Sequence, residues 1–245
     1  MKAMIFAAGL GTRLRPLTDN RPKALVETGG KTLLELVITK LTAAGFDEII
    51  VNVHHFAEQI IDFIRQNDGF GARIAISDER GELLDTGGGV RKAAWFFDDG
   101  KPFLLHNVDI LSNIDLKKIY KNHLETAAEA TLAVNSRATS RYLFFDKNMQ
   151  MKAWKNETSG EIKPFGTKID EDWQKLAFAG IHVILPSLLT KMKAGKFSII
   201  DFYLSVLDKT NISGFYDPDM QMIDVGKLHS IKEAEMFVER FLVKK

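Results

Sequence analysis

The sequence opens with Met1-Lys2-Ala3-Met4-Ile5-Phe6-Ala7-Ala8-Gly9-Leu10-Gly11-Thr12-Arg13-Leu14-Arg15-Pro16-Leu17-Thr18 and continues, after Asp19-Asn20, with Arg21-Pro22-Lys23-Ala24-Leu25-Val26. The apolar run up to Ala7 predicts a buried strand, and the glycines that follow predict a tight turn at its end. Glycine lets a phosphate approach backbone N–H groups, and arginine and lysine side chains neutralise its charge. This stretch therefore predicts a nucleoside triphosphate site in an α/β protein.

Two other phosphate-binding loops are excluded by their spacing. The dinucleotide fingerprint needs a third glycine where this chain has Leu14, and Pro16 stands where that motif opens a long helix. Gly29-Gly30-Lys31-Thr32 imitates the end of a Walker A loop, but Leu25 occupies the position of its first glycine. A nicotinamide-binding enzyme should also carry an acidic residue at the end of its second strand, and that strand ends here in Val53-His54.

The opening stretch resembles the signature of the sugar-1-phosphate nucleotidylyltransferases, the NDP-sugar pyrophosphorylases. Their pattern is roughly A-A-G-x-G-T-R-L-x-P-L-T followed by P-K-x-L-V, and the match covers Ala7 to Leu25. The resemblance implies the nucleotide-diphospho-sugar transferase fold, a Rossmann-like, mixed and mostly parallel sheet flanked by helices. It also implies Mg²⁺-dependent transfer of a nucleotidyl group from an NTP to a sugar 1-phosphate, which forms an NDP-sugar and releases pyrophosphate.

Composition excludes several other classes of protein. The 245 residues are 45% hydrophobic and 27% charged with a net charge of +1, so no general positive field attracts nucleic acid or an anionic membrane. The chain has no cysteine, which excludes disulfides and thiolate metal sites. The N-terminal apolar run is too short for a signal peptide, and no stretch is long enough for a transmembrane helix. We expect a cytoplasmic protein.

The hydrophobic period alternates between strand-like and helix-like along the first half of the chain, which predicts a parallel sheet covered by helices. Gly45 is expected to stop one helix and Asp115 to cap another. The expected strands are Lys2–Ala7, Glu48–Val53, Arg73–Ser77 and Pro102–Asn107, and the expected helices are Thr32–Ala44, Ala57–Asn67, Gly88–Phe97 and Asp115–Thr126.

The second half has a different pattern. We expect strands at Ala130–Asn135, Tyr142–Asp146, Met151–Lys155 and Ala177–Leu185, a loop over the site at Ser159–Gln174, helices at Ile199–Lys209 and His229–Val243, and a turn with a short strand at Tyr216–Ile223. We predict one domain over residues 1–245, with a nucleotide half at about 1–128 and a sugar-side insertion at about 129–185. The hexapeptide-repeat β-helix that some family members append is not expected.

Nucleotidyl transfer is an in-line displacement in which positioning and charge neutralisation do the catalysis. In the family, the arginine of G-T-R contacts the β- and γ-phosphates and the lysine of P-K bridges the reacting phosphates. The resemblance assigns these catalytic roles to Arg13 and Lys23, whereas Arg15 is expected to be a solvated or salt-bridged neighbour. The other positions expected to cradle the nucleotide phosphates are Ala8, Gly9, Gly11 and Thr12.

Two aspartates are the expected Mg²⁺ ligands. Asp109 ends an apolar strand, at the sheet edge where α/β proteins bind ligands. It resembles the metal-binding aspartate of the family's N-G-D segment and is counted with the catalytic residues, although Val108 replaces the usual glycine and disfavours a positive φ. Asp224, in Met222-Ile223-Asp224-Val225-Gly226, resembles the late D-V-G segment that supplies the second carboxylate.

The base-binding loop is predicted at Leu84-Asp85-Thr86-Gly87-Gly88-Gly89, which resembles the family loop that meets the nucleobase. Consecutive glycines that open a helix also permit close approach of a ligand to the backbone. The nucleotide-binding residues expected here are Thr86, Gly87, Gly88 and, at the end of the preceding strand, Asp78, with its neighbour Glu79 as an alternative contact to base or ribose.

The sugar side rests on weaker similarity. Phe178-Ala179-Gly180-Ile181-His182-Val183 resembles the family strand whose glycine lies against the sugar, and Glu161-Ile162-Lys163-Pro164 is similar to the sugar-binding E-K-P with an inserted isoleucine. The expected sugar-phosphate residues are Asn107, Gly180, Lys163 and Glu161. His54-His55 is expected to make a loop contact with the sugar or to have a helix-entry role, and not to bind zinc. Trp95, Phe96 and Phe97 are predicted to be core residues.

The pattern is most similar to N-acetylmuramate 1-phosphate uridylyltransferases and small mannose-1-phosphate guanylyltransferase-like proteins, and it leaves base and sugar open. The expected partners are an NTP and a sugar 1-phosphate, with a homo-oligomer as an option. Two alternatives stay open. One is a phosphocholine cytidylyltransferase-like enzyme, with an aromatic cage drawn from Tyr142, Trp154 and Trp173. The other is a catalytically silent subunit that senses nucleotide sugars.

Overall fold

The computed structural model describes residues 1–242, and within them ten strands form one mixed sheet. Its parallel part has the order β6-β1-β4-β5, and the register joins Met4 to Leu105 on one side and to Ile50 on the other. These strands are β1 (Lys2–Phe6), β4 (Glu48–Val53), β5 (Arg73–Asp78) and β6 (Phe103–Asn107). The four strands predicted for the first half are confirmed.

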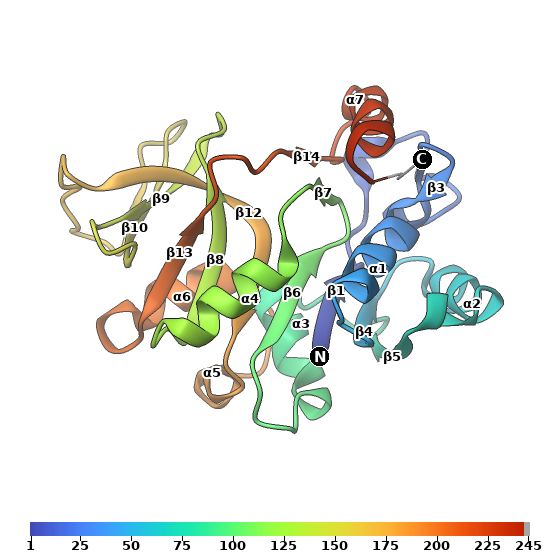
Figure 1. Ribbon diagram of the computed structural model, residues 1–245, viewed down its shortest axis with the longest axis horizontal. Helices are drawn as coiled ribbons and strands as arrows, with labels where there is room; N and C mark the ends of the chain where they lie inside the picture. The colour runs from blue at the N-terminus through green and yellow to red at the C-terminus, as the bar shows by residue number, and fades with distance from the viewer. Residues whose placement is uncertain (243–245) are drawn as a thin grey trace.

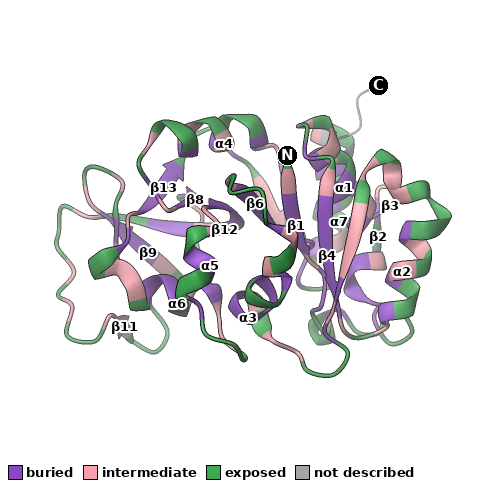
Figure 2. Ribbon diagram, turned by 90° about the horizontal axis from the view of Figure 1, so that it is seen from below, coloured by how far each residue is buried: buried purple, intermediate pink, exposed green. Residues whose placement is uncertain are grey.

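Helices cover both faces of this sheet (Figure 1). Because side chains alternate along a strand, Ile5 packs on one helical layer and Met4 on the other. The first layer contains α1 (Leu33–Ala43), α2 (Ala57–Gln66), α4 (Leu116–Glu125) and α7 (Ser230–Phe237). The second contains α3 (Asp85–Lys92), α5 (Ser187–Lys191) and α6 (Ile199–Val206). Figure 2 shows the buried strands between the two layers.

Local signals explain where the helices begin and end. The Asp115 carboxylate accepts hydrogen bonds from the backbone N–H groups of Lys117 and Lys118, as expected of an N-cap. Thr32 caps α1 in the same way through Glu35 N. Gly45 follows α1 with a φ of +84°, which confirms it as the stop.

The sugar-side segment extends the same sheet with antiparallel strands. These are β8 (Ala130–Asn135), β9 (Arg141–Phe145), β10 (Met151–Asn156), β11 (Ile162–Lys163) and β12 (Gln174–Ile184). The long strand β12 joins the two parts, since its end pairs with β6 and its first residues pair with β9. The register between β12 and β8 shifts between Phe178 and His182, and Gly180 lies in this interruption. The position of the site between the two parts follows from this shared strand.

Several short elements were not predicted. Strand β13 (Ile212–Tyr216) pairs in parallel with β8, and its central Gly214 is close-packed, because an added Cβ would lie 2.9 Å from the Phe145 ring. The short strand expected within Tyr216–Ile223 is β14 (Met222–Asp224), and it pairs with β7 (Ile110–Ser112), which was not predicted. Strand β11 lies inside the segment expected to be a loop, which also ends earlier, because β12 begins at Gln174.

Three helix predictions need correction, those for Gly88–Phe97, Ile199–Lys209 and His229–Val243. The helix expected to reach Phe97 ends at Lys92 and continues as a 3₁₀ turn over Ala93–Phe96, so the tighter turn points Trp95 outward. Trp95 is 61% exposed and is not a core residue, whereas Phe97 is buried and stacks on Phe103.

At the C-terminus, α7 gives way to a π-helical turn at Val238–Leu242, and Val243 lies outside the described residues. The expected helix Ile199–Lys209 is α6 plus a 3₁₀ turn at Leu207–Lys209. Within residues 1–242, no helix combines the length and the apolar character that crossing a bilayer requires.

Candidate active site

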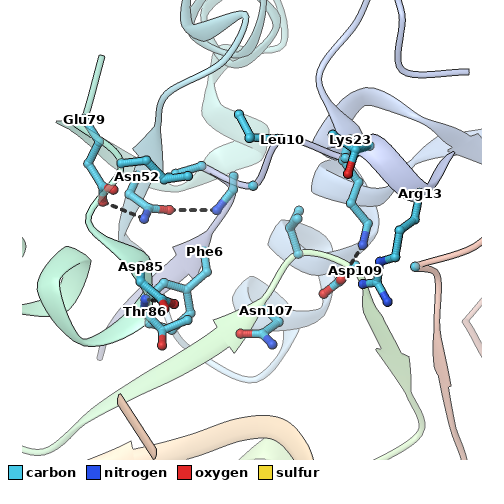
Figure 3. Close-up of a pocket in the computed structure, with 18 of the residues that line it drawn as sticks. Phe6, Leu10, Arg13, Lys23, Asn52, Glu79, Asp85, Thr86, Asn107 and Asp109 are labelled. Atoms are coloured by element: carbon cyan, nitrogen blue, oxygen red, sulfur yellow. Dashed lines mark hydrogen bonds and ion pairs between the residues drawn. The ribbon is translucent and has the colours of Figure 1, made fainter. Parts of the chain in front are cut away.

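Two cavities meet at the C-terminal ends of β1 and β6. The first, of about 450 Å³, is lined by the phosphate loop and by residues from the ends of β4, β5 and β6 (Figure 3). The second, of about 810 Å³, lies on the side of β9–β11. Residues that line both are Arg13, Asp85, Thr86 and Asn107. A substrate in one cavity is therefore within reach of a substrate in the other.

The predicted phosphate loop, residues 8–13, has a backbone conformation that requires glycine at position 11. Gly11 has a φ of +66° and precedes the 3₁₀ turn Thr12–Leu14, and its carbonyl accepts a 2.8 Å hydrogen bond from Thr18 Oγ1. An added Cβ at Gly11 would lie 3.1 Å from the Lys23 Cβ atom. Gly9 has no atom within 4 Å of its added Cβ and borders the first cavity. The predicted residues Ala8, Gly9, Gly11, Thr12, Arg13 and Lys23 all line this cavity.

The Lys23 ammonium donates a hydrogen bond to Oδ2 of Asp109 in the first cavity (Figure 3). Lys23 is buried in the 3₁₀ turn Lys23–Leu25, and Asp109 follows β6. The backbone before Asp109 is ordinary, because Val108 has no positive φ and donates its N–H to Phe6 O at 3.2 Å. The replacement of glycine by valine therefore leaves the predicted position of this carboxylate intact.

Asp224 reaches the same place from the other end of the chain. Strand β14 aligns it with Ile110, and Val225 N donates to Asp109 O at 2.8 Å. An added Cβ at Gly226 would lie 2.6 Å from Asp224 Oδ1 and 3.1 Å from Arg13 Nη2. Glycine at this position therefore lets the carboxylate and the guanidinium approach each other.

These groups form a mixed cluster of two carboxylates and three cations. Burial raises the pKa of Asp224, the charge of Asp109 raises it further, and Lys23, Arg13 and Arg137 oppose the shift. Mg²⁺ in nucleotide-dependent enzymes is held by one or two carboxylates plus substrate phosphates. The donor set fits such an ion, and the Lys23 ammonium already places a positive charge against Asp109.

The base side differs from the prediction. Glu79 is fully buried, lines the first cavity and accepts from Asn52 Nδ2 at 2.7 Å, and Asn52 Oδ1 accepts from Ala7 N at 2.7 Å. Asp78 lines neither cavity and binds the Arg80 guanidinium, so of the two neighbouring acids the structure brings Glu79 to the site.

Thr86 lines both cavities, but Gly87 and Gly88 do not. Their N–H groups donate to Phe197 O at 2.9 and 3.3 Å. An added Cβ would lie 2.3 Å from the Phe197 ring at Gly87 and 2.2 Å from Gly195 O at Gly88. Packing of α3 under the 195–197 segment accounts for these two glycines, and their nucleotide-binding role stays a prediction.

The sugar-side residues gather around the second cavity. Lys163 Nζ lies 2.9 Å from Asp201 Oδ1 and 3.6 Å from Glu161 Oε1, and the hydrogen bond to Asp201 raises the pKa of Lys163. Lys163, Glu161 and Asn107 line this cavity. Gly180 does not, but its φ of +71° and an added Cβ at 2.8 Å from Asn107 Nδ2 show how closely the strand approaches that side chain.

The lining residues that carried no motif and were missed include Arg137, Arg141, Asn156 and Lys196. They come from strands and loops of the second half of the chain. Their positions near the cavities depend on how these strands pair, and no local sequence motif marks them.

The structure also shows where Arg15 and His54 lie. Arg15 is exposed and forms an ion pair with Asp19 at 3.5 Å, outside both cavities. His54 Nδ1 lies 2.7 Å from Glu79 O, so this histidine contacts the base-side loop.

The comparisons with known proteins agree with this geometry. A family model described as nucleotidyl transferase matches residues 2–240. The N-acetylmuramate α-1-phosphate uridylyltransferase of Caulobacter vibrioides is 33% identical over 218 residues, which cover 82% of each chain. A UTP–glucose-1-phosphate uridylyltransferase of Synechocystis is 30% identical over 249 residues, which cover 96% of this chain and 62% of that protein.

The structural comparison supports the fold. The UDP-glucose pyrophosphorylase of Acinetobacter baumanii superimposes with a TM-score of 0.78 at 17% identity, over 97% of this chain and 92% of that one. Together with the family match over nearly the whole sequence, this places the chain in the nucleotidyl transferase family.

Proposed function

We propose that this protein transfers a nucleotidyl group from an NTP to a sugar 1-phosphate, with Mg²⁺ bound by Asp109 and Asp224. The observation that carries the proposal is the cluster of Arg13, Lys23, Asp109 and Asp224 at the junction of two cavities. One cavity suits the nucleotide, since the phosphate loop lines it. The other suits the acceptor, and the transferred phosphorus is at the junction.

The reaction needs no nucleophile from the protein. An oxygen of the sugar phosphate attacks the α-phosphorus in line, a new P–O bond forms, and the bond to the β-phosphate oxygen breaks with its electron pair leaving on pyrophosphate. Arg13 binds the departing phosphates, and the Lys23 ammonium neutralises charge on the oxygens of the reacting phosphates. Mg²⁺ at the two carboxylates supplies further neutralisation and orientation of these oxygens.

The relatives support a uridylyl donor, since both named above are uridylyltransferases. Their acceptors differ, because one name specifies N-acetylmuramate 1-phosphate and the other glucose 1-phosphate. We therefore propose UTP as the donor and treat both sugar phosphates as candidate acceptors.

The phosphocholine alternative loses support from the placement of its aromatic residues. A cage for a quaternary ammonium needs several aromatic rings around one point. Trp154 lines the second cavity, but Tyr142 and Trp173 line neither cavity. Lys163 lies over the Trp154 ring at 5.1 Å and Lys175 over the Tyr142 ring at 4.2 Å, so two of the rings already face a cation.

The test is pyrophosphate release in the presence of Mg²⁺. UTP, GTP, CTP and dTTP are each combined with N-acetylmuramate, glucose and mannose 1-phosphates and with phosphocholine, and Asp109→Asn serves as the inactive control. A preferred pair of UTP with one sugar 1-phosphate is expected. Nucleotide binding by calorimetry without release from any pair would contradict catalysis and favour the sensing subunit.

A further inference from the structure

One face of the β9–β10 ribbon forms a wall of the second cavity. Side chains alternate between the two faces of a strand, so Arg141 and Leu143 of β9 share a face. Their cross-strand partners on β10 are Asn156 and Trp154, and all four residues line the cavity. The wall therefore presents an apolar and aromatic surface next to one amide and one guanidinium.

Arg141 and Asn156 offer hydrogen-bond donors on this wall. The Asn156 Oδ1 atom accepts from Thr158 N at 2.9 Å, which leaves the Nδ2 hydrogens without a partner among residues 1–242. Within the same residues, the Arg141 guanidinium makes no ion pair or hydrogen bond, while the backbone N–H of Arg141 donates to Thr139 Oγ1 at 3.4 Å. A guanidinium beside an amide N–H₂ group is a donor set suited to a carboxylate.

Two other cations of this cavity, Lys163 and Arg137, have partners among the described residues. Lys163 is paired with Asp201 and Glu161. The Arg137 guanidinium donates to Phe178 O at 3.2 Å. Arg141 is therefore a cation of the sugar side that has no acidic partner among the described residues. The reacting phosphates do not account for it either.

We propose that Arg141 and Asn156 bind a carboxylate on the acceptor sugar, so that the acceptor is the 1-phosphate of an acidic sugar and not of a neutral hexose. This inference rests on the proposed function. Trp154 and Leu143 pack against C–H groups of the sugar ring, while the carboxylate accepts hydrogen bonds from both donors. A charge-assisted pair at a partly exposed site contributes about a ten- to hundredfold preference over an acceptor without the carboxylate.

The experiment compares two acceptors that differ in one group. N-acetylmuramate 1-phosphate carries a lactyl carboxylate that N-acetylglucosamine 1-phosphate lacks, and kcat/KM is measured for both with UTP and Mg²⁺. The wild-type protein should prefer the acidic acceptor. Arg141→Gln should remove the preference by raising KM for the acidic acceptor about ten- to hundredfold, with KM for UTP unchanged.

A second variant separates recognition from folding. Asn156→Asp keeps an oxygen for Thr158 N but adds a negative charge to the wall, so it should weaken the acidic acceptor and spare the neutral one. Arg65→Gln, which removes an exposed guanidinium on α2 with the ion pair to Asp62, should change neither acceptor.

Equal use of both acceptors by the wild-type protein would overturn the inference, as would an Arg141→Gln variant that loses both acceptors alike. If neither acceptor releases pyrophosphate, the proposed transferase activity fails, and calorimetry of the two sugar phosphates still decides the inference. Tighter binding of the acidic sugar phosphate that is lost in Arg141→Gln supports it, and equal binding contradicts it.

Discussion

Opposite charges from distant parts of the sequence meet where the two cavities adjoin. Arg13 and Lys23 come from the first loop, Asp109 from the end of β6 and Asp224 from β14. In this arrangement the charge of Asp109 raises the pKa of Asp224, and the three cations oppose that rise. A nucleotide brings negative phosphates into this cluster, and its metal ion brings positive charge. Single substitutions in the cluster should therefore change the affinity for the nucleotide and kcat to different extents.

Arg13→Ala should lower kcat with UTP and the preferred acceptor by about a hundred- to thousandfold, because one preorganised charge on the departing phosphates is removed. Arg15→Ala is a matched control, since this exposed arginine pairs with Asp19 outside both cavities. Steady-state kinetics of the two variants measures the difference. Equal activity in both would contradict the assignment of Arg13.

Lys23→Ala should make folding stability depend more strongly on Mg²⁺. Without the ammonium, the carboxylate of Asp109 loses its ion-pair partner near a second carboxylate. An ion that binds only the folded protein at a hundred times its Kd stabilises by about 2.7 kcal/mol, and each kcal/mol corresponds to about 2–4 °C in Tm for a chain of this size.

Thermal unfolding in Mg²⁺ and in EDTA should therefore show a larger Tm difference for Lys23→Ala than for the wild-type protein, in which the ion competes with the ammonium. The double variant Lys23→Ala/Asp109→Asn should lose the extra difference. Identical Mg²⁺ shifts in wild type and Lys23→Ala would place the ion elsewhere.

At the scale of elements, α3 and the 195–197 segment depend on each other. The added Cβ of Gly87→Ala would lie 2.3 Å from the Phe197 ring, so this change should lower the free energy of unfolding by about 1–3 kcal/mol. It should also lower turnover, since Lys196 of the same segment lines the first cavity. Gly81→Ala, with no atom within 4 Å of the added Cβ, is the control in urea denaturation.

Adding Phe197→Leu to Gly87→Ala should recover part of the lost stability, because the clash is with a side chain that can be shortened. If Gly87→Ala unfolds at the same urea concentration as Gly81→Ala, the packing explanation for the glycine is wrong.

Elements with strong local signals could be predicted from the sequence, and those set by packing could not. The parallel strands have continuous apolar runs, and the cap at Asp115 is a local hydrogen bond. By contrast, β13 contains Gly214, which weakens a strand pattern and is explained only by contact with Phe145. Trp95 belongs to an apparent amphipathic helix, but a switch to 3₁₀ geometry turned it outward.

At the scale of the molecule, the candidate site divides in the same way. The phosphate loop, Asp109 and Asp224 could be predicted as candidate residues, because binding nucleotide phosphates requires particular residues at particular spacings, and the structure brings them to the two adjoining cavities. The sugar wall could not, because Arg141 and Asn156 become neighbours only when β9 and β10 pair. Strand β12 pairs with both β9 and β6 and so joins this wall to the parallel sheet. In Figure 1, β12 lies between β9 and β10 at one end of the molecule and β4 and β5 at the other.

The stability of the whole molecule should fall as the pH is lowered through the range in which unfolded histidines become charged. Burial lowers the pKa of His182 to about 3 and that of His123 to about 4, from 6.5. Below pH 6.5 the unfolded chain binds protons that the folded protein does not, so the free energy of unfolding decreases toward low pH. By pH 5 each such imidazole contributes a loss of about 1–2 kcal/mol.

His182→Phe should reduce this loss, because phenylalanine fills the space between Phe178 and Tyr203 and takes up no proton. Urea denaturation of the wild type and the variant at pH 7 and pH 5 measures the difference between the two losses. Val183→Ala, a change at a buried apolar neighbour, should lower stability equally at both pH values. A His182→Phe protein with the full wild-type loss would show that proton uptake by other groups governs acid unfolding.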